Sequence, residues 1–289
     1  MEKTVMNKHK NTTEHSKLVS LGPWALITGA SDGIGKATAM ELAGEGFNVV
    51  LVARRKALLE ELACEISSAH GVGVQTISAD LGQPNGVSEF LADLGNTGVH
   101  LNEIGVAVLA AGYGTTGALH DVNIKTERDM LRVNCDAVLQ LCHVFAGSMK
   151  ARGAGHLVLF GSIVGFQGNA MTANYAATKA YVQTLAEGLA VEMASHGVTV
   201  QAVAPGPIAT GFAARAGMTM GQAGTPDTVA RAILKGLGQS GTIRPGFLSK
   251  VLGYNLAMTP RPLRVRIMSK IMSGMATPRP HAGKVIQDT

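Results

Sequence analysis

The sequence is poor in aromatic residues, charge and cysteine, and each shortage narrows the class of protein. Aromatic residues make up 4% of the 289 residues and charged residues 16%, against 46% hydrophobic residues, so a disordered or fibrous chain is not expected. The three cysteines, Cys64, Cys135 and Cys142, are odd in number and show neither metal-binding nor redox spacing. We therefore expect reduced thiols, no disulfide framework and no metal site.

A secretory leader and a membrane span are not expected either. The stretch Met1–Lys17 is polar and lacks the apolar run of a signal peptide. Two stretches without charge, Ile104–His120 and Gly153–Thr178, are interrupted by Gly and by polar residues that a spanning helix would have to bury in lipid. Together with the reduced thiols, these features predict a cytoplasmic protein.

What the chain does contain is a regular alternation of short apolar runs and longer helical patterns. The apolar runs are β-branched and continuous, as in strands buried on both faces of a parallel sheet. The expected strands are Ala25–Thr28, Asn48–Ala53, Val74–Ser78, Val106–Ala110, His156–Phe160 and Thr199–Val203. The expected helices are Ile34–Glu45, Lys56–His70, the region around Gly86–Leu94, Glu127–Arg152 and Asn174–His196. This order predicts a single α/β domain with a doubly wound parallel sheet.

The charge and the element pattern both change near the C-terminus. We expect a flexible tail over residues 1–20, one domain over residues 21–242, and a basic, apolar extension over residues 243–289 in which Pro260 and Pro262 separate two candidate helices. After residue 240 there are eight Lys and Arg and one acidic residue, whereas the body has no basic stripe, so nucleic-acid binding is not expected. The extension could touch a membrane surface, cap a lipophilic pocket, or pack on the body or a partner subunit.

The first predicted strand runs through the glycine-rich turn Thr28–Gly35 directly into the first helix. Glycines there permit a tight turn and let the backbone approach a pyrophosphate, while the helix N-terminus presents free N–H groups to phosphates. Because this turn lies between the first strand and helix of a βαβ unit, it predicts a nucleotide-binding site.

The second predicted strand ends in Ala53, Arg54 and Arg55. An NAD site usually places Asp or Glu at this strand end, whereas an arginine suits a 2′-phosphate, so we expect NADP(H). Asp32, the residue before Gly33, is acidic and so does not favour a phosphate nearby. The expectation of NADP(H) therefore depends on Arg54. Asp80, at the end of the third strand, could bind an adenine amino group or cap the following helix.

A second group of polar residues suits proton transfer. Tyr175 and Lys179 are four residues apart on a predicted helix and so share a face. A nearby ammonium would lower the pKa of the phenol and make it a usable acid or base near neutral pH. Ser162, just past the fifth strand, could donate to a substrate carbonyl oxygen.

These motifs, together with Ala110-Ala111-Gly112, Asn134 and Pro205-Gly206, occur in one order over about residues 22–240, and in this the chain resembles the short-chain dehydrogenase/reductase family. The resemblance implies a Rossmann fold, a dimer or tetramer formed through the two long helices, and hydride transfer at a carbonyl or alcohol carbon. It implies a catalytic set of Asn134, Ser162, Tyr175 and Lys179, with Asn134 anchoring a water behind Lys179. The implied cofactor-binding residues are Gly29, Ser31, Asp32, Gly33, Ile34, Gly35, Arg54, Arg55, Asp80, Leu81, Ala111, Gly112, Tyr175, Lys179, Pro205, Gly206, Ile208 and Thr210.

One departure from the family pattern concerns the fourth strand. The family usually reads Asn-Asn-Ala-Gly at this strand end, where this chain has Leu109-Ala110-Ala111-Gly112. The turn glycine is kept, but the asparagines that tie the strand end to its neighbours are absent. The local hydrogen bonding there is therefore open.

The substrate region is predicted to be apolar. Its expected rim is Val164–Thr172, Tyr113-Gly114 and Gly211–Gly224, with Phe166, Phe212, Met218 and Met220 as apolar members. Such a rim suits a lipophilic ketone or secondary alcohol. A 3-oxoacyl thioester reductase is the main rival within the enzyme class. A nucleotide-binding sensor or scaffold without turnover, or a peripheral membrane protein, are the alternatives outside it.

Overall fold

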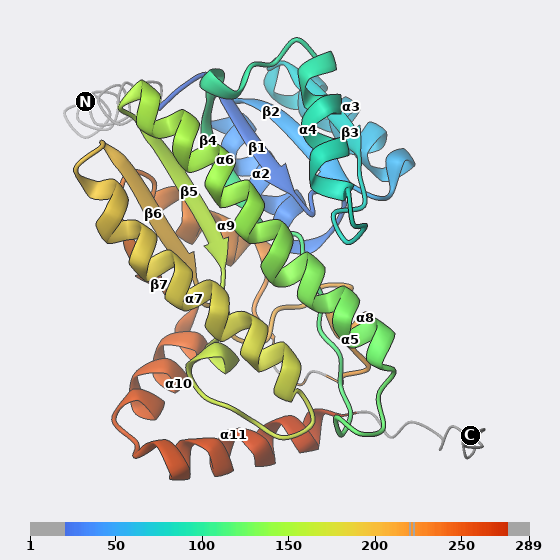
Figure 1. Ribbon diagram of the computed structural model, residues 1–289, viewed down its shortest axis with the longest axis vertical. Coiled ribbons are helices and arrows are strands. Elements are labelled where there is room, and N and C mark those ends of the chain that lie inside the picture. The colour runs from blue at the N-terminus through green and yellow to red at the C-terminus, as the bar shows by residue number, and fades with distance from the viewer. Residues whose placement is uncertain (1–20, 220, 222, 277–289) are drawn as a thin grey trace, which may run out of the picture.

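The computed structural model describes residues 21–219, 221 and 223–276, and its centre is one parallel sheet of seven strands (Figure 1). The strands are β1 Trp24–Thr28, β2 Asn48–Ala53, β3 Val74–Ser78, β4 Ile104–Leu109, β5 Gly155–Phe160, β6 Val198–Val203 and β7 Gly241–Ile243. Their order across the sheet is β3-β2-β1-β4-β5-β6-β7, and every neighbouring pair is parallel. The order reverses between β1 and β4, which is where sheets of this kind bind ligands.

Helices cover both faces of the sheet. On one face α4 (Gly86–Asn96), α6 (Ala137–Arg152) and α7 (Ala173–Ala194) bury Phe90, Phe145 and Val182 against the strands (Figure 1). On the other face α2 (Gly33–Gly44), α3 (Lys56–His70) and α9 (Pro226–Lys235) bury Leu42, Leu59 and Ile233. The two apolar layers make the expected doubly wound Rossmann sheet, and the chain forms a single domain.

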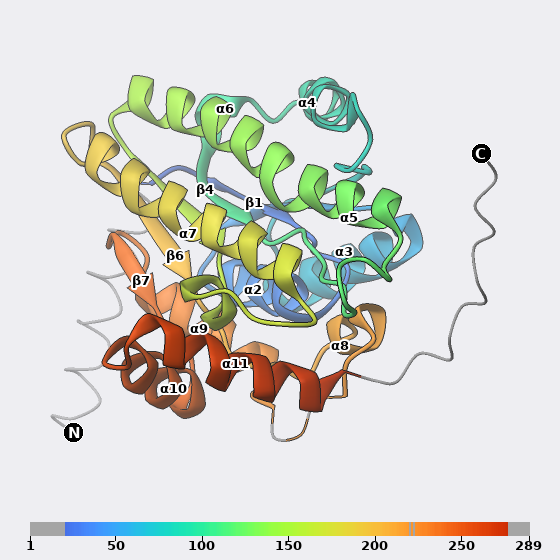
Figure 2. The same ribbon diagram turned by 60° about the horizontal axis from the view of Figure 1, so that its bottom comes forward.

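A third apolar cluster lies beyond the carboxyl ends of the strands. It joins α8 (Phe212–Ala216), α10 (Phe247–Ala257) and α11 (Arg261–Met275) to the N-terminal half of α7 through Met218, Leu256, Met268, Met272 and Tyr175. Figures 1 and 2 show α10 and α11 next to each other at the end of the molecule toward which the strands point. Residues 241–275 are thus packed on the body as β7 and the helices α10 and α11.

The long helix expected over Glu127–Arg152 is interrupted. It begins as α5 (Ile124–Leu131), passes through a π-helical turn over Arg132–Asp136 and continues as α6. The π-helical segment is only five residues long, too short to change the apolar period of the sequence visibly, so the sequence pattern does not reveal the turn. The short strand β7 and the helices α8 and α9 were not predicted either. No helix in the part of the chain that the structure describes is long and apolar enough to cross a membrane.

Candidate active site

A cavity of about 850 Å³ opens beyond the carboxyl ends of the strands. Every site residue named from the sequence lines it except Asn134, which lies directly behind its wall. The cavity has two chemically different ends. One end is formed by the glycine-rich turn and the ends of β2 and β3, and the other by the apolar side chains of α8, α10 and α11.

The turn between β1 and α2 contains glycines at positions where a side chain would be strained or too close to its neighbours. Gly29 and Gly33 have positive φ angles of 70° and 55°, a backbone region that side chains rarely permit. A Cβ on Gly35 would lie 2.3 Å from the carbonyl oxygen of Gly29. This close approach brings the first turn of α2 to the cavity, where its free N–H groups can bind an anion.

Arginines surround the beginning of α2. The Arg55 guanidinium donates to the Ser31 hydroxyl through Nε at 3.2 Å and Nη2 at 2.9 Å, and to the Ser31 carbonyl at 3.1 Å. Asp32 pairs with Arg215 at 3.1 Å and with Arg55 at 3.8 Å. Asp32 therefore has a guanidinium on two sides, a pairing that the sequence did not indicate. Arg215 was missed because it is 183 residues from Asp32 and stands in no recognisable motif.

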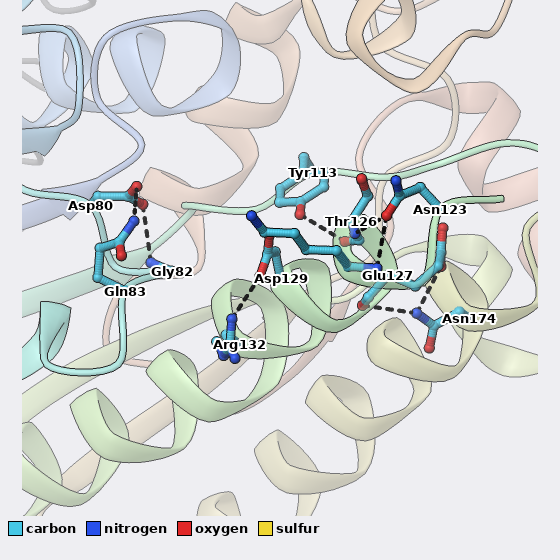
Figure 3. A network of polar contacts seen from close by, with 11 residues as sticks. Asp80, Gly82, Gln83, Tyr113, Asn123, Thr126, Glu127, Asp129, Arg132 and Asn174 are labelled. Carbon is cyan, nitrogen blue, oxygen red and sulfur yellow. Dashed lines mark hydrogen bonds and ion pairs between the residues drawn. The ribbon is translucent and has the colours of Figure 1, made fainter. Parts of the chain in front are cut away.

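Asp80 organises the turn after β3. Its carboxylate accepts from the Gly82 amide at 3.1 Å and from the Gln83 side chain at 3.2 Å (Figure 3). The following helix α4 has Asn85 at its N-cap position, so Asp80 does not cap that helix. The carboxylate instead fixes the turn that forms one wall of the cavity.

The proton-transfer group lies at the centre of the cavity wall. Tyr175 and Lys179 stand one turn apart on α7 and are 8% and 7% exposed. The Lys179 ammonium donates to the Phe160 carbonyl at 2.8 Å and lies 5.8 Å from the centre of the Tyr175 ring. Ser162 follows β5, is also buried, and its hydroxyl accepts from the Val164 amide at 3.3 Å.

Burial dominates the acid–base properties of these groups. It raises the pKa of the Tyr175 phenol above its ordinary value, and the contact with the Ser162 hydroxyl acts in the opposite direction. It lowers the pKa of the Lys179 ammonium to about 8. The sequence predicted that Lys179 would lower the pKa of Tyr175; in the structure burial is the largest influence on this pKa and raises it, and the ammonium donates to the Phe160 carbonyl.

Asn134 is positioned by the π-helical turn. Its Nδ2 donates to the Tyr113 carbonyl at 2.8 Å and to the Thr178 hydroxyl at 3.1 Å, while its Oδ1 accepts from the Tyr113 amide at 3.1 Å. A Cβ on Gly112 would lie 2.9 Å from Asn134 Oδ1 and 3.6 Å from Lys179 Nζ. Asn134 and Lys179 thus both approach the point where a side chain at position 112 would lie, and the glycine leaves that space open.

The end of β4, where this chain lacks the asparagines of the family pattern, is held by a threonine on the neighbouring strand β1. The Thr28 hydroxyl at the end of β1 accepts from the Ala111 amide at 3.0 Å and donates to the Val108 carbonyl at 3.5 Å. This pair of bonds ties β1 to the end of β4. The hydrogen bonding that the sequence left open is supplied from the neighbouring strand.

A polar network holds α5 against α7 at the edge of the site (Figure 3). The buried Glu127 carboxylate accepts from the Asn174 side chain at 2.8 Å, and the Tyr113 hydroxyl donates to the Thr126 carbonyl at 3.0 Å. Asn174 is the residue before Tyr175. The network therefore fixes the start of α7, and with it the position of the phenol.

The other end of the cavity is apolar and comes largely from the C-terminal extension. Its lining side chains are Phe212, Met218, Leu252, Met268, Ile271, Met272 and Met275. The ring centres of Phe212 and Tyr175 are 5.6 Å apart. Of the predicted rim residues, Phe212 and Met218 line the cavity. Phe166 does not line it; Arg244 Cζ lies over the Phe166 ring, 4.8 Å from the ring centre. Met220 lies outside the described residues.

A residue of the extension also reaches the loop Pro205–Thr210. The buried Ser249 hydroxyl on α10 accepts from the Gly206 amide at 2.7 Å. The sequence gave no signal for this contact. It joins the extension to the loop whose residues the family resemblance assigns to cofactor binding.

Comparison with known proteins gives a consistent result. Residues 23–220 match the family model described as short chain dehydrogenase. A 7beta-hydroxysteroid dehydrogenase of Clostridium sardiniense is 34% identical over 189 residues, which cover 65% of this chain and 70% of the relative. A very-long-chain 3-oxoacyl-CoA reductase of Anas platyrhynchos is 31% identical over 268 residues, which cover 87% of this chain and 84% of the relative.

Among solved structures, a short-chain dehydrogenase from Sphingobium yanoikuyae in complex with NADPH superimposes with a TM-score of 0.72 at 27% identity. The match covers 91% of this chain and 100% of that one.

Proposed function

This chain belongs to the short-chain dehydrogenase/reductase family of oxidoreductases, and from that premise we propose that it transfers a hydride between NADP(H) and a bulky lipophilic ketone or secondary alcohol. The family acts on hydroxyl and carbonyl groups with a nicotinamide cofactor. The choice of NADP(H), the substrate class and the roles of the individual residues are the proposal.

The charges around the adenosine end support NADP(H). No carboxylate stands at the end of β2, where Ala53 lies, and the cavity is lined there by Arg54, Arg55 and Arg215. Asp32 offsets one of these three charges. A 2′-phosphate would meet the two remaining positive charges and the Ser31 hydroxyl, whereas an NAD ribose would find no acceptor at the strand end.

The buried polar group supports proton transfer by Tyr175. When bound, the nicotinamide ring supplies or accepts the hydride. In the reductive direction the phenol of Tyr175 donates its proton to the carbonyl oxygen, and its raised pKa keeps it protonated throughout the physiological range. The Ser162 hydroxyl donates to the same oxygen, and the Lys179 ammonium stabilises the phenolate that is left and holds the ribose hydroxyls.

The observation that carries the substrate class is the position of α11. This helix places Met268 and Met272 over the wall that contains Tyr175, and the apolar end of the cavity has no charged lining residue from α10 or α11. Flexible, polarizable methionine side chains adapt to large apolar ligands. A bulky ketone fits this end, and a 3-oxoacyl thioester is the second candidate because the reductase of Anas platyrhynchos matches 87% of this chain.

The same arrangement argues against a sensor or scaffold without turnover. Burying a lysine and a serine beside a tyrosine lowers the stability of the fold, and a protein that only binds a nucleotide would not need this arrangement.

Exposed apolar residues on the long helices, Leu139 on α6 and Tyr181 and Val191 on α7, support the expectation of a homodimer or homotetramer through these helices. Sedimentation of the purified chain would measure that assembly.

The test is oxidation of NADPH and of NADH by the purified protein with bulky ketones and with 3-oxoacyl thioesters. We expect turnover with NADPH and its loss, by about two orders of magnitude or more, in Tyr175→Phe. Tyr181→Phe, an exposed tyrosine on the same helix, is the matched control and should retain full activity. Equal loss in both variants, or retained activity in Tyr175→Phe, would contradict the proposed role of Tyr175.

A further inference from the structure

The two C-terminal helices carry exposed apolar side chains, most of which do not line the cavity. On α10, Phe247, Val251, Tyr254 and Met258 follow one another at helical spacing, and Phe247 and Met258 are 83% and 88% exposed. On α11, Leu263, Ile267 and Ile271 form a second stripe at four-residue spacing, and all three are exposed. Contiguous exposed apolar residues of this kind mark an interaction surface.

The charge beside these stripes is of one sign. Lys250 on α10 and Arg261, Arg266 and Lys270 on α11 are exposed, and no acidic residue occurs in the sequence between Asp227 and Asp288. Arg266 and Lys270 are one turn apart, next to the stripe of Leu263 and Ile267. Each of the two helices thus carries an exposed apolar stripe, and the charged residues of the helices themselves are all positive.

We propose that this face of α10 and α11 docks on an anionic lipid surface. Amphipathic helices with basic borders lie in the membrane interface, with the apolar side chains between the lipids and the cations at the headgroups. Docking of two copies through this face would bring the same positive groups together, because a two-fold interface pairs a surface with itself. Charge complementarity therefore favours anionic lipid over a second copy of the chain.

The face is continuous with the wall of the cavity. Ile271 belongs to the exposed stripe and also lines the cavity, and Leu252 and Met275 line it from the same two helices. Contact with lipid would place the apolar end of the cavity next to the hydrocarbon. This second step rests on the proposed function, because it matters only if the substrate is lipophilic, whereas the docking itself does not depend on turnover.

The experiment is co-sedimentation of the full chain with vesicles of phosphatidylcholine alone and with vesicles that contain phosphatidylglycerol. We expect binding to the anionic vesicles, weakened by 0.5 M salt, and little binding to the neutral ones. Arg266→Gln combined with Lys270→Gln should weaken binding about 30-fold, since each cation near such a surface contributes about 1 kcal/mol. Phe247→Ser combined with Met258→Ser should weaken it about tenfold or more.

Leu58→Ser is the matched control, because Leu58 is an exposed apolar residue on α3, outside the docking face and outside the long helices of the expected subunit interface. It should bind as the wild type does. Absence of binding to anionic vesicles would overturn the proposal, as would equal weakening by the control. If Phe247→Ser with Met258→Ser instead reduces the number of subunits in solution while the wild type ignores vesicles, the face is an interface between copies. Because sedimentation needs no substrate, a failure here is distinguishable from a failure of the proposed activity.

Discussion

The buried Lys179 ammonium makes a prediction about stability that can be separated from activity. Lys179 is 7% exposed, and burial lowers its pKa from 10.5 to about 8. At about 1.36 kcal/mol for each pKa unit, the folded protein near neutral pH carries a cost of about 3.4 kcal/mol for keeping this amine charged. Lys179→Met removes the charge at similar side-chain length, and it also removes the hydrogen bond to the Phe160 carbonyl.

The sign of the pH dependence follows from proton binding. Between about pH 8 and pH 10.5 the unfolded chain holds the Lys179 proton and the folded chain does not, so the free energy of unfolding of the wild type rises with pH in this window. Between pH 7.5 and pH 10 it should rise by about 2.5 kcal/mol relative to Lys179→Met, in which this group cannot titrate. At pH 7 the variant should be more stable by about 0.5–2.5 kcal/mol, since the unpaired carbonyl costs about 1–3 kcal/mol.

Urea unfolding of both proteins at several pH values, without added nucleotide, measures the difference. All other titrating groups are shared and cancel in the comparison. A difference that stays constant from pH 7.5 to pH 10 would refute the claim that burial lowers the pKa of Lys179. A difference that moves in the opposite direction would mean that an acidic partner raises this pKa. If Lys179→Met is more stable but loses reductase activity, the Lys179 amine is required for activity although it lowers the stability of the protein.

Three further substitutions test other parts of the site. Arg55→Gln should raise the KM for NADPH about 10- to 100-fold and leave that for NADH nearly unchanged, because one charge-assisted contact to the 2′-phosphate is lost; a matched rise for NADH would contradict the proposed phosphate site. Met272→Trp should block bulky ketones and spare small ones, as kcat/KM for the two classes would show, whereas Ser273→Trp on the exposed side of the same helix should change neither. Ser249→Ala leaves the Gly206 amide without its partner and should lower the free energy of unfolding by about 1–3 kcal/mol, measured by urea unfolding; an unchanged value would mean that α10 does not anchor this loop.

The sequence by itself determined the features that are set by neighbouring residues. The six predicted strands were right within a few residues, because burial on both faces of a parallel sheet requires continuous apolar runs, and the helices between them were right apart from the π-helical turn at Arg132–Asp136. The glycine-rich turn could be predicted because Gly29, Gly33 and Gly35 are demanded by a local backbone path. Tyr175 and Lys179 could be paired because four residues make one helical turn. Family resemblance added Asn134, which no local pattern would have selected.

Only the tertiary structure decided the contacts between distant segments. Arg215 neutralises Asp32 from 183 residues away, and Ser249 reaches Gly206 from α10. The cover of α11 over the Tyr175 wall is a contact of the same kind. The raised pKa of Tyr175 and the lowered pKa of Lys179 have the same origin, because burial is a property of everything packed around a group. Periodicity and motifs report what a residue's neighbours in sequence require, whereas charge pairing and desolvation depend on which segments meet in the folded chain.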